Sequence, residues 1–241
     1  MVTHAVILAA GRGTRLAHRG QLSPKGFLQI GSEPIIKESL HRLYSVGITS
    51  VTIVTGHLSS FYDELAENDS RITTVHNNKF AISGSMYSLF LLKNKINKTF
   101  FLLESDLVYE TRALRLMQQF TYDNCLLVSG LTESDDEVWV EARQGKLWNL
   151  SKKQEEITSP YGELVGITKL APDFFQHMCS QAMEYFEKSL NVEYETILAA
   201  TARKIPVPCL KVEDLLWAEI DTEEHLNRVR EKVYAAICSS T

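Results

Sequence analysis

The first residues that could do chemistry lie in a glycine-rich stretch behind an apolar run. Residues 8–16 read LAAGRGTRL, and Gly11 and Gly13 lack the side chains that would keep an anion away from backbone N–H groups. Arg15 adds charge-assisted donors. A P-loop would end in Gly-Lys-Ser/Thr, and a dinucleotide-binding loop would carry a third glycine where this chain has Leu16. The stretch therefore predicts a phosphate-holding loop of another kind, with a plain strand-to-helix turn as the alternative.

Two aspartates that end apolar runs are candidate metal ligands. Asp106 ends FFLLESD and Asp221 ends LLWAEID. Ligands of open α/β sheets usually bind at the carboxyl ends of strands, and Mg²⁺ prefers a few carboxylates together with phosphate oxygens and water. We expect the pair to hold Mg²⁺, with an N-cap of the following helix as the alternative for Asp221. Glu104 and Glu219 each precede an aspartate by two residues, so strand alternation points them the same way as their neighbours.

The elements that must position these residues alternate between strand and helix in the first half of the chain. Strand-like runs cover 4–9, 51–55, 72–75, 99–103 and 125–129, and helix-like patterns cover 34–46, 58–67 and 110–120. This alternation predicts an α/β fold with a mostly parallel sheet sandwiched by helices.

The second half has a different pattern. From about residue 137 the chain alternates apolar and polar residues around Gly145, as a β-hairpin does, and GELVGITKLA looks like a second hairpin-sized element. We expect an antiparallel extension laid beside the sheet. Helices near 172–188 and 193–201, a short strand in PVPCLKV and a C-terminal helix from about 222 follow. We expect 1–241 to be one domain, with a nucleotide-binding half 1–130 and an acceptor-binding half 131–241.

Composition excludes several classes of protein. A net charge of -5 argues against nucleic acid as a partner, because such binding needs a basic face. Four cysteines without C-x-x-C spacing indicate neither a zinc site nor a disulfide framework. Neither a signal peptide nor a membrane-spanning run is recognisable. We expect a cytoplasmic monomer or homodimer with no nucleic acid and no membrane partner.

Residues 8–30 resemble the signature of nucleoside triphosphate-dependent nucleotidyltransferases, in which a G-x-G-x-R loop is followed by Pro-Lys. The matching parts are AAGRGTRL, Ser23-Pro24-Lys25 and GSEPII. The resemblance continues through IVTGH (53–57), HNNKFAISGSMYSLFLL (76–92), FLLESD (101–106) and WAEIDTEEHL (217–226). Together these look most like phosphocholine and 2-aminoethylphosphonate cytidylyltransferases. PKGFLQIG, LLESDLVYE and GELVGITKL lean toward the latter, and AHRGQL replaces the Pro-Leu-Thr stretch common in sugar-phosphate members.

The resemblance implies a Rossmann-like, GT-A-like fold and a Mg²⁺-dependent transfer of CMP from CTP to 2-aminoethylphosphonate, with release of pyrophosphate. Phosphocholine is the second acceptor to consider, then a sugar 1-phosphate. A non-catalytic nucleotide-binding regulatory subunit is the alternative of another class. By resemblance, Arg15 neutralises the β and γ phosphates and Lys25 the α-phosphate, and Asp106 and Asp221 bind the metal. The nucleotide-binding positions are Leu8, Ala9, Ala10, Gly11, Gly13, Thr14, Gly84 and Ser85.

The acceptor amine calls for aromatic rings if it is quaternary, and for carboxylates and hydrogen-bond acceptors if it is primary. The candidate rings are Tyr87, Trp139, Tyr194 and Trp217. The candidate carboxylates are Asp136, Glu137, Glu141, Glu163, Glu195 and Glu219. Lys152 and Lys153, in LSKK, are candidate partners of the phosphonate. For each ring the alternative is a place in the core or at its rim, and for the two lysines an exposed turn at the end of the hairpin.

Overall fold

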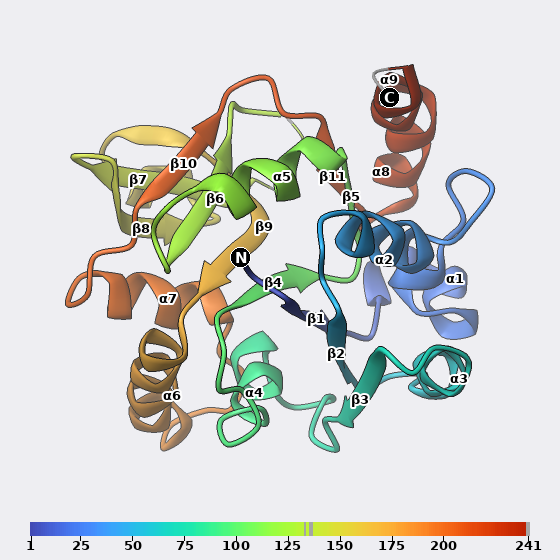
Figure 1. Cartoon of the computed structure of the whole chain (residues 1–241), viewed down its shortest axis with the longest axis horizontal. Helices are drawn as coiled ribbons and strands as arrows, with labels where there is room; N and C mark the ends of the chain where they lie inside the picture. Colours follow the sequence, from blue (N-terminus) through green and yellow to red (C-terminus); the bar gives the residue numbers. More distant parts are fainter. Residues whose placement is uncertain (133, 135–136, 240–241) are drawn as a thin grey trace.

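A central β-sheet organises the computed structural model, which describes residues 1–132, 134 and 137–239 (Figure 1). Its strands follow the order β10-β6-β9-β4-β1-β2-β3. Their bounds are β1 (His4–Ala9), β2 (Ser50–Thr55), β3 (Ile72–His76), β4 (Phe100–Glu104), β6 (Cys125–Ser129), β9 (Pro160–Leu170) and β10 (Cys209–Val212). The pairs β1–β2, β2–β3, β1–β4 and β6–β10 are parallel. The predicted mostly parallel sheet is confirmed, and the parallel strands β1 and β4 end at the same edge.

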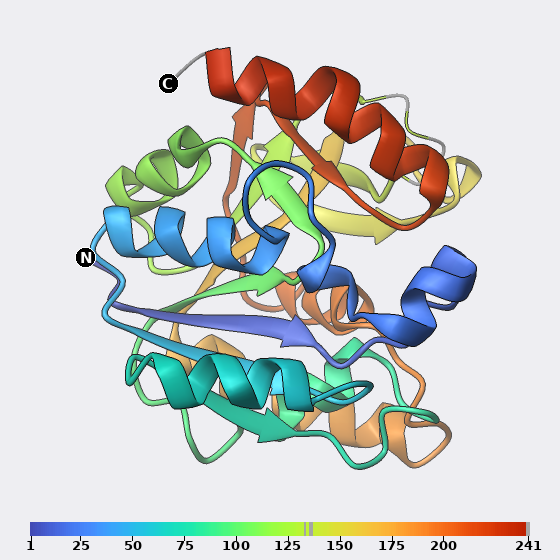
Figure 2. The ribbon, with the colours of Figure 1, turned by 90° about the vertical axis from the view of Figure 1, so that its right-hand side faces the viewer.

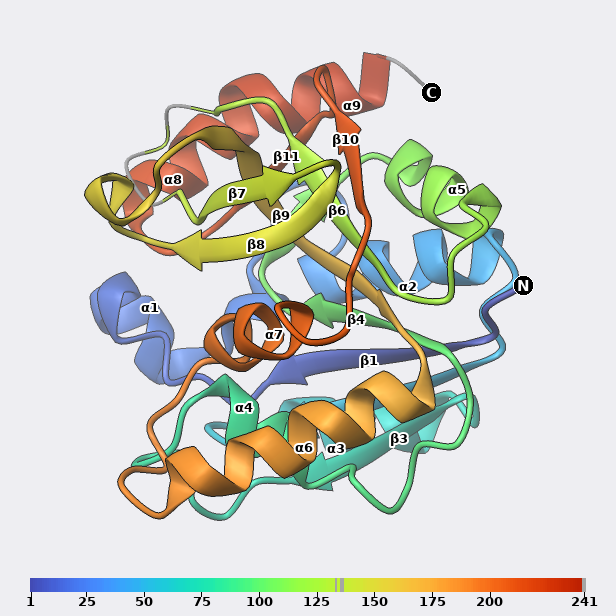
Figure 3. The ribbon, with the colours of Figure 1, turned by 90° about the vertical axis from the view of Figure 1, so that its left-hand side faces the viewer.

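Helices cover both faces of this sheet. Figure 3 shows α4 (Ser85–Phe90), α6 (Pro172–Phe186) and α7 (Tyr194–Ala202) in front of it, with α2 (Ile35–Ser45) and α5 (Thr111–Gln119) behind. Tyr62 of α3 (Ser60–Asn68) belongs to the same hydrophobic cluster as the buried faces of α2 and α5. Alternate residues of a strand serve the two faces: Phe100 and Leu102 join the α6 side, and Phe101 and Leu103 the α2 side. The predicted helices are confirmed to within a few residues at each end.

Strand β9 differs from its prediction. GELVGITKL does not form a hairpin-sized element beside the sheet; it belongs to one strand that runs antiparallel between β4 and β6. Gly166 interrupts it with φ of +77°, and a Cβ there would lie 3.0 Å from Leu107 Cδ1. Glycine meets both demands, the positive φ and the close approach. The sequence pattern around Gly166 therefore reflects one kinked strand. Strands from both halves of the chain share the central sheet.

The first predicted hairpin is confirmed. β7 (Trp139–Arg143) and β8 (Lys146–Ser151) pair antiparallel around Gln144 and Gly145, which both have positive φ, as a tight hairpin turn requires. β7 also pairs with β9, which attaches the hairpin to the central sheet.

A small second sheet joins two distant parts of the chain. β5 (Leu107–Tyr109) pairs antiparallel with β11 (Trp217–Glu219), so the run ending at Asp221 lies here and not in the central sheet. α8 (Glu223–Arg228), a π-helical turn and α9 (Tyr234–Ser239) follow as one helical rod, seen along the top of Figure 2. Within the described residues, every helix falls short of what a membrane crossing requires.

Candidate active site

A cavity of about 310 Å³ opens at the carboxyl ends of β1 and β4. Every predicted nucleotide-binding residue lines it, together with Arg15 and Lys25. Those residues come from the end of β1, the glycine loop and the start of α4, so segments about 75 residues apart meet as the resemblance implied. The structure brings this predicted set together; what each residue binds stays a prediction.

The glycine loop is shaped by contacts that sequence reasoning missed. Gly13 has φ of +59°, and its carbonyl oxygen accepts a hydrogen bond from the Leu16 N–H at 3.0 Å. Gly20, in α1 (Ala17–Leu22), packs so closely that a Cβ there would lie 2.2 Å from the Gly13 carbonyl oxygen. His57 Nε2 lies 3.0 Å from the Gly20 carbonyl oxygen. A Cβ on Gly11 would meet no atom within 4 Å, and Gly11 lines the cavity, so the space beside this glycine is open.

Lys25 lies between two carboxylates at the edge of the cavity. It follows Pro24 in a short 3₁₀ turn, and its Nζ donates to Asp106 Oδ2 at 2.7 Å and to Asp221 Oδ1. Burial alone would lower its pKa, but the charges of Asp106, Asp221 and Glu219 outweigh burial and raise the pKa. Lys25 therefore stays protonated and carries its charge into the site.

Asp221 is almost fully buried and is held by cations. Besides Lys25, Arg15 Nη1 approaches its Oδ2 at 2.6 Å. Burial would raise the Asp221 pKa, but Lys25 and Arg15 lower it, so the group is ionised. The alternative role as an N-cap is wrong, because the side chain that accepts from the His225 N–H, at 3.2 Å, belongs to Thr222.

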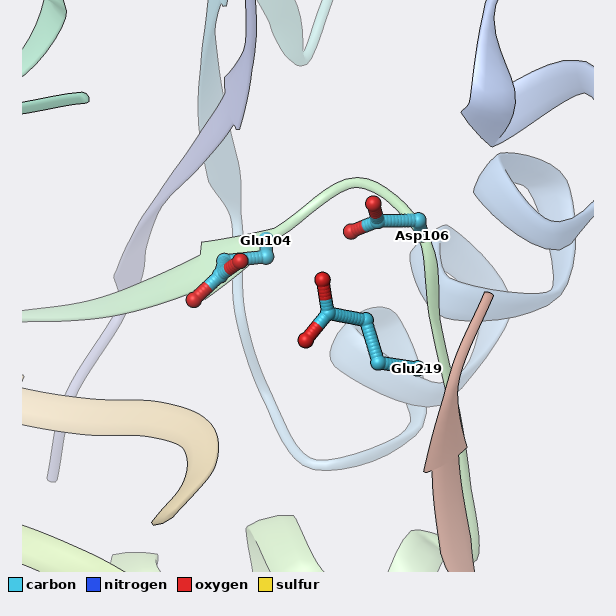
Figure 4. Close-up of side chains that lie close together, drawn as sticks. All are labelled: Glu104, Asp106 and Glu219. Carbon is cyan, nitrogen blue, oxygen red and sulfur yellow. The ribbon is translucent and has the colours of Figure 1, made fainter. Parts of the chain in front are cut away.

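Three carboxylates, Asp106 among them, converge beside Lys25. Glu104 at the end of β4, Asp106 in the following turn and Glu219 on β11 point toward one another, with one oxygen from each within 4.8 Å of the others (Figure 4). Burial and the neighbouring carboxylates raise the pKa of Glu104 above its usual range and that of Glu219 to about 8. Lys25 compensates part of this negative charge through its ion pair with Asp106, and the cluster of oxygens suits a hard divalent cation such as Mg²⁺. It includes Asp106, as predicted, whereas Asp221 is turned to Lys25 and Arg15.

The far wall of the cavity is tied to α4 by a chain of hydrogen bonds. The backbone N–H and the hydroxyl of Ser85 both donate to Glu193 Oε2, at 3.1 and 2.5 Å, and Ser85 Oγ accepts from the Tyr194 N–H at 2.8 Å. The Tyr194 hydroxyl donates to Glu104 Oε1 at 2.9 Å. This chain places Tyr194 and Glu195 at the cavity, where Lys152 also lies. Glu193 lines the same wall and was not among the predicted residues.

Several predicted acceptor residues lie elsewhere. Trp139 pairs with Glu163 across β7 and β9, and neither lines the cavity. The buried Glu163 accepts from the N–H and the hydroxyl of Thr132, at 2.8 and 3.1 Å. Trp217 belongs to the core beneath α2 and α5. Tyr87 packs edge-on against Phe186, Glu137 accepts from the Ser134 N–H, and Glu141 accepts from the Thr158 N–H. Asp136 falls outside the described residues.

A Rossmann-like sheet that carries a glycine loop, a buried lysine and clustered carboxylates at one strand edge defines a nucleotidyltransferase. Residues 5–203 match the MobA-like NTP transferase domain, and the chain belongs to that family. The inositol-1-phosphate CTP transferase from T. maritima has the same fold: it superposes with a TM-score of 0.83 at 20% identity, covering 98% of this chain and 96% of that chain.

Three curated relatives act on different small molecules by name. The bifunctional IPC transferase and DIPP synthase of Aquifex aeolicus is 25% identical over 238 residues, which are 95% of this chain and 51% of the relative. The choline-phosphate cytidylyltransferase of Streptococcus pneumoniae is 27% identical over 59% of this chain and 66% of its own length. The 2-aminoethylphosphonate cytidylyltransferase of Lancefieldella rimae is 27% identical over 44% of each chain. The chain thus spans about half the length of the Aquifex relative.

Proposed function

We propose that the chain is a Mg²⁺-dependent cytidylyltransferase that transfers CMP from CTP to 2-aminoethylphosphonate and releases pyrophosphate. The observation that carries this proposal is the single cavity that holds the glycine loop, Arg15, Lys25 and the carboxylates Glu104, Asp106 and Glu219. The names of the pneumococcal and Lancefieldella relatives support cytidylyl transfer to a small phospho- or phosphono-amine. The family membership supports the use of a nucleoside triphosphate.

Charge is the main obstacle to this reaction, because an anionic acceptor oxygen must attack the α-phosphorus of a triphosphate. The attacking oxygen forms the new P–O bond while the bond to the β-phosphate oxygen breaks, and the electron pair leaves with pyrophosphate. The protein therefore needs no nucleophile of its own; it must align the reactants and neutralise their charge. We assign Lys25 to the α-phosphate and Arg15 to the β and γ phosphates. Backbone groups of residues 8–10, with Gly84 and Ser85, contact the cytosine.

The carboxylate cluster fits the metal that this reaction calls for. We propose Asp106 as its central ligand, together with Glu219 at the end of β11 and Asp221 two residues further on. Lys25 Nζ already bridges Asp106 and Asp221, so both carboxylates converge on one point of positive charge. Mg²⁺ bound by these oxygens would supply charge neutralisation for the phosphates.

The cavity favours a primary amine over a quaternary one. Among the described residues the rings of Tyr62, Phe80 and Tyr194 line it, and Tyr194 is the one of these three that stands between Glu193 and Glu195; Trp139 and Trp217 lie outside. Carboxylates of Glu193 and Glu195 line the same wall. A quaternary ammonium is bound by several ring faces, whereas a primary ammonium needs hydrogen-bond acceptors. Phosphocholine is therefore the second candidate and a sugar 1-phosphate the third.

Pyrophosphate release tests the proposal. CTP and Mg²⁺ are combined with 2-aminoethylphosphonate, phosphocholine, phosphoethanolamine or glucose 1-phosphate, and UTP and ATP replace CTP as controls. We expect the highest kcat/KM with CTP and 2-aminoethylphosphonate. A preference for phosphocholine would make phosphocholine the acceptor, with the cytidylyl transfer unchanged. CTP binding without turnover of any acceptor would favour the non-catalytic regulatory subunit.

A further inference from the structure

A second cavity adjoins the first on its acceptor side. It measures about 340 Å³, and Lys152, Glu193 and Glu195 line both cavities. Its remaining wall comes from β8, from α7 beyond Glu195 and from four residues outside these two elements: Val138, Glu156, Tyr185 and Arg203. A molecule that reaches Glu195 from the first cavity therefore has room to continue into a space of similar size.

Glu195 is an acidic group at the boundary between the two cavities, where Lys152 also lies. Its Oε2 is buried, and no hydrogen-bond donor within the described part of the chain reaches it. Burial and the neighbouring Glu193 raise its pKa to about 7, against the opposing charge of Lys152. Glu193, in contrast, already accepts two hydrogen bonds from Ser85. A buried carboxylate without a partner is costly, and a cation with an N–H group would satisfy it.

The wall beyond Glu195 contains an apolar part, which lies among the polar residues Asn149, Ser151, Glu156 and Thr196. Ala199 and Ala200 lie on the next turn of α7, and Leu150 and Val138 face the same cavity. Arg203 is already engaged there, since its Nη2 donates to Asn149 Oδ1 at 3.1 Å and its Nε donates to the Trp148 carbonyl oxygen at 3.3 Å. The inner part of this cavity therefore offers contact to carbon. Its positive charge lies at Lys152, on the boundary with the first cavity, and at the already engaged Arg203.

We infer, on the basis of the proposed cytidylyl transfer, that the second cavity receives an alkyl group carried on the acceptor's amine, while Glu195 binds the ammonium. The acceptor class this geometry points to is a phosphonate or phosphate ester whose amine is secondary. A secondary ammonium keeps N–H groups for Glu195 and places its alkyl group against Ala199 and Ala200. A primary amine meets Glu195 and leaves the second cavity unused.

The test compares 2-aminoethylphosphonate with its N-propyl derivative as acceptors, by pyrophosphate release with CTP and Mg²⁺. For the wild-type protein, kcat/KM should be at least about tenfold higher with the N-propyl compound than with 2-aminoethylphosphonate. A tenfold gain is the lower end of what one methylene group contributes in a hydrophobic pocket. Ala200→Leu, which fills the second cavity, should remove that advantage. Ala235→Leu, at an exposed alanine of α9, is the matched control and should keep it. Thr196→Leu, at the exposed mouth of the same cavity, replaces Ala200→Leu if that variant does not fold.

Glu195→Gln tests the ammonium site separately. It should raise the acceptor KM at least about tenfold for both amines while the CTP KM stays within about twofold, as expected when a charged hydrogen bond is lost. Glu187→Gln, at an exposed glutamate after α6, is its control.

The outcomes separate the two proposals. If 2-aminoethylphosphonate is turned over and the N-propyl derivative has an equal or lower kcat/KM, the second-cavity inference alone is overturned. The same holds if Ala200→Leu changes kcat/KM equally for both acceptors. Absence of turnover with every acceptor would overturn the proposed function, and the inference with it.

Discussion

The two walls of the first cavity are built in different ways. The nucleotide wall comes from a short stretch of chain, the glycine loop and Lys25, joined by the start of α4. The acceptor wall comes from Lys152 just after β8, from Glu219 on β11 and from residues 193–195 at the start of α7, which are distant in sequence. Local motifs can thus specify how a common substrate is held, whereas the contacts that select a particular acceptor depend on how distant elements pack.

The walls also differ in charge. Arg15 and Lys25 face the cavity from the nucleotide side, and Glu104, Glu193, Glu195 and Glu219 face it from the other side, where Lys152 is the accompanying cation. A triphosphate and an ammonium are therefore each met by the opposite charge. The following four predictions test whether one wall binds the nucleotide and the other binds the acceptor, beginning with the largest expected effect.

Lys25→Ala should lower kcat by about 10²–10³-fold, the size expected when one preorganised donor to the reacting phosphate is lost. The acceptor KM should change little, because Lys25 belongs to the nucleotide wall. Steady-state kinetics check this, with circular dichroism in the presence of Mg²⁺ to confirm the fold. Lys37→Ala, at an exposed lysine of α2, is the control. Near-normal turnover would remove Lys25 from the mechanism.

Asp106→Asn and Asp221→Asn should each raise the Mg²⁺ concentration for half-maximal activity at least about tenfold, since loss of an outer-shell partner alone costs about 10–100-fold in metal affinity. A Mg²⁺ titration of pyrophosphate release measures the shift, with Asp173→Asn at an exposed site of α6 as the control. An unchanged titration in one variant would assign that aspartate to holding Lys25 only.

Gly20→Ala should destabilise the protein by about 1–3 kcal/mol, because its Cβ would overlap the Gly13 carbonyl oxygen and force the loop to move. Gly11→Ala should change stability by less than about 0.5 kcal/mol, since its Cβ meets nothing. Urea unfolding separates the two, and a CTP KM that rises in Gly11→Ala then reports direct approach of the nucleotide. If Gly20→Ala is as stable as the wild type, the loop is not held by this contact.

Ser85→Ala should cost about 1 kcal/mol of stability, the net value of a typical hydrogen bond, because its hydroxyl links Glu193 to the Tyr194 N–H. Because this link positions the acceptor wall, the acceptor KM should rise a few-fold. Urea unfolding and initial-rate kinetics measure both, with Ser180→Ala on the exposed side of α6 as the control. A rise confined to the CTP KM would instead place Ser85 at the cytosine, as the resemblance implied.

The parallel part of the sheet and the helices that cover it were predictable because each strand and helix has its own hydrophobic period. The kinked strand β9 was not, since alternation around Gly166 looks the same in a hairpin and in one bent strand, and partner strands are not encoded locally. The same limit applies to the site. Lys25 and Asp106 stand in recognisable motifs, whereas the roles of Gly20 and Glu193 depend on contacts with residues 7 and 108 positions away.

The position of β9 also sets the order in which the sheet can close during protein synthesis. β6 pairs with β9 and β10, both of which follow it in the chain, and β4 is flanked by β1 and β9. A nascent chain that ends near residue 130 already contains the whole glycine loop. At that length β6 has been synthesised before its partners β9 and β10, and the edge of β4 that pairs with β9 is open. Open edges recruit strands from other chains, and pairing of distant strands is slow. A fragment cut at residue 130 should therefore aggregate, and circular permutants that shorten the path from β4 to β9 should refold faster.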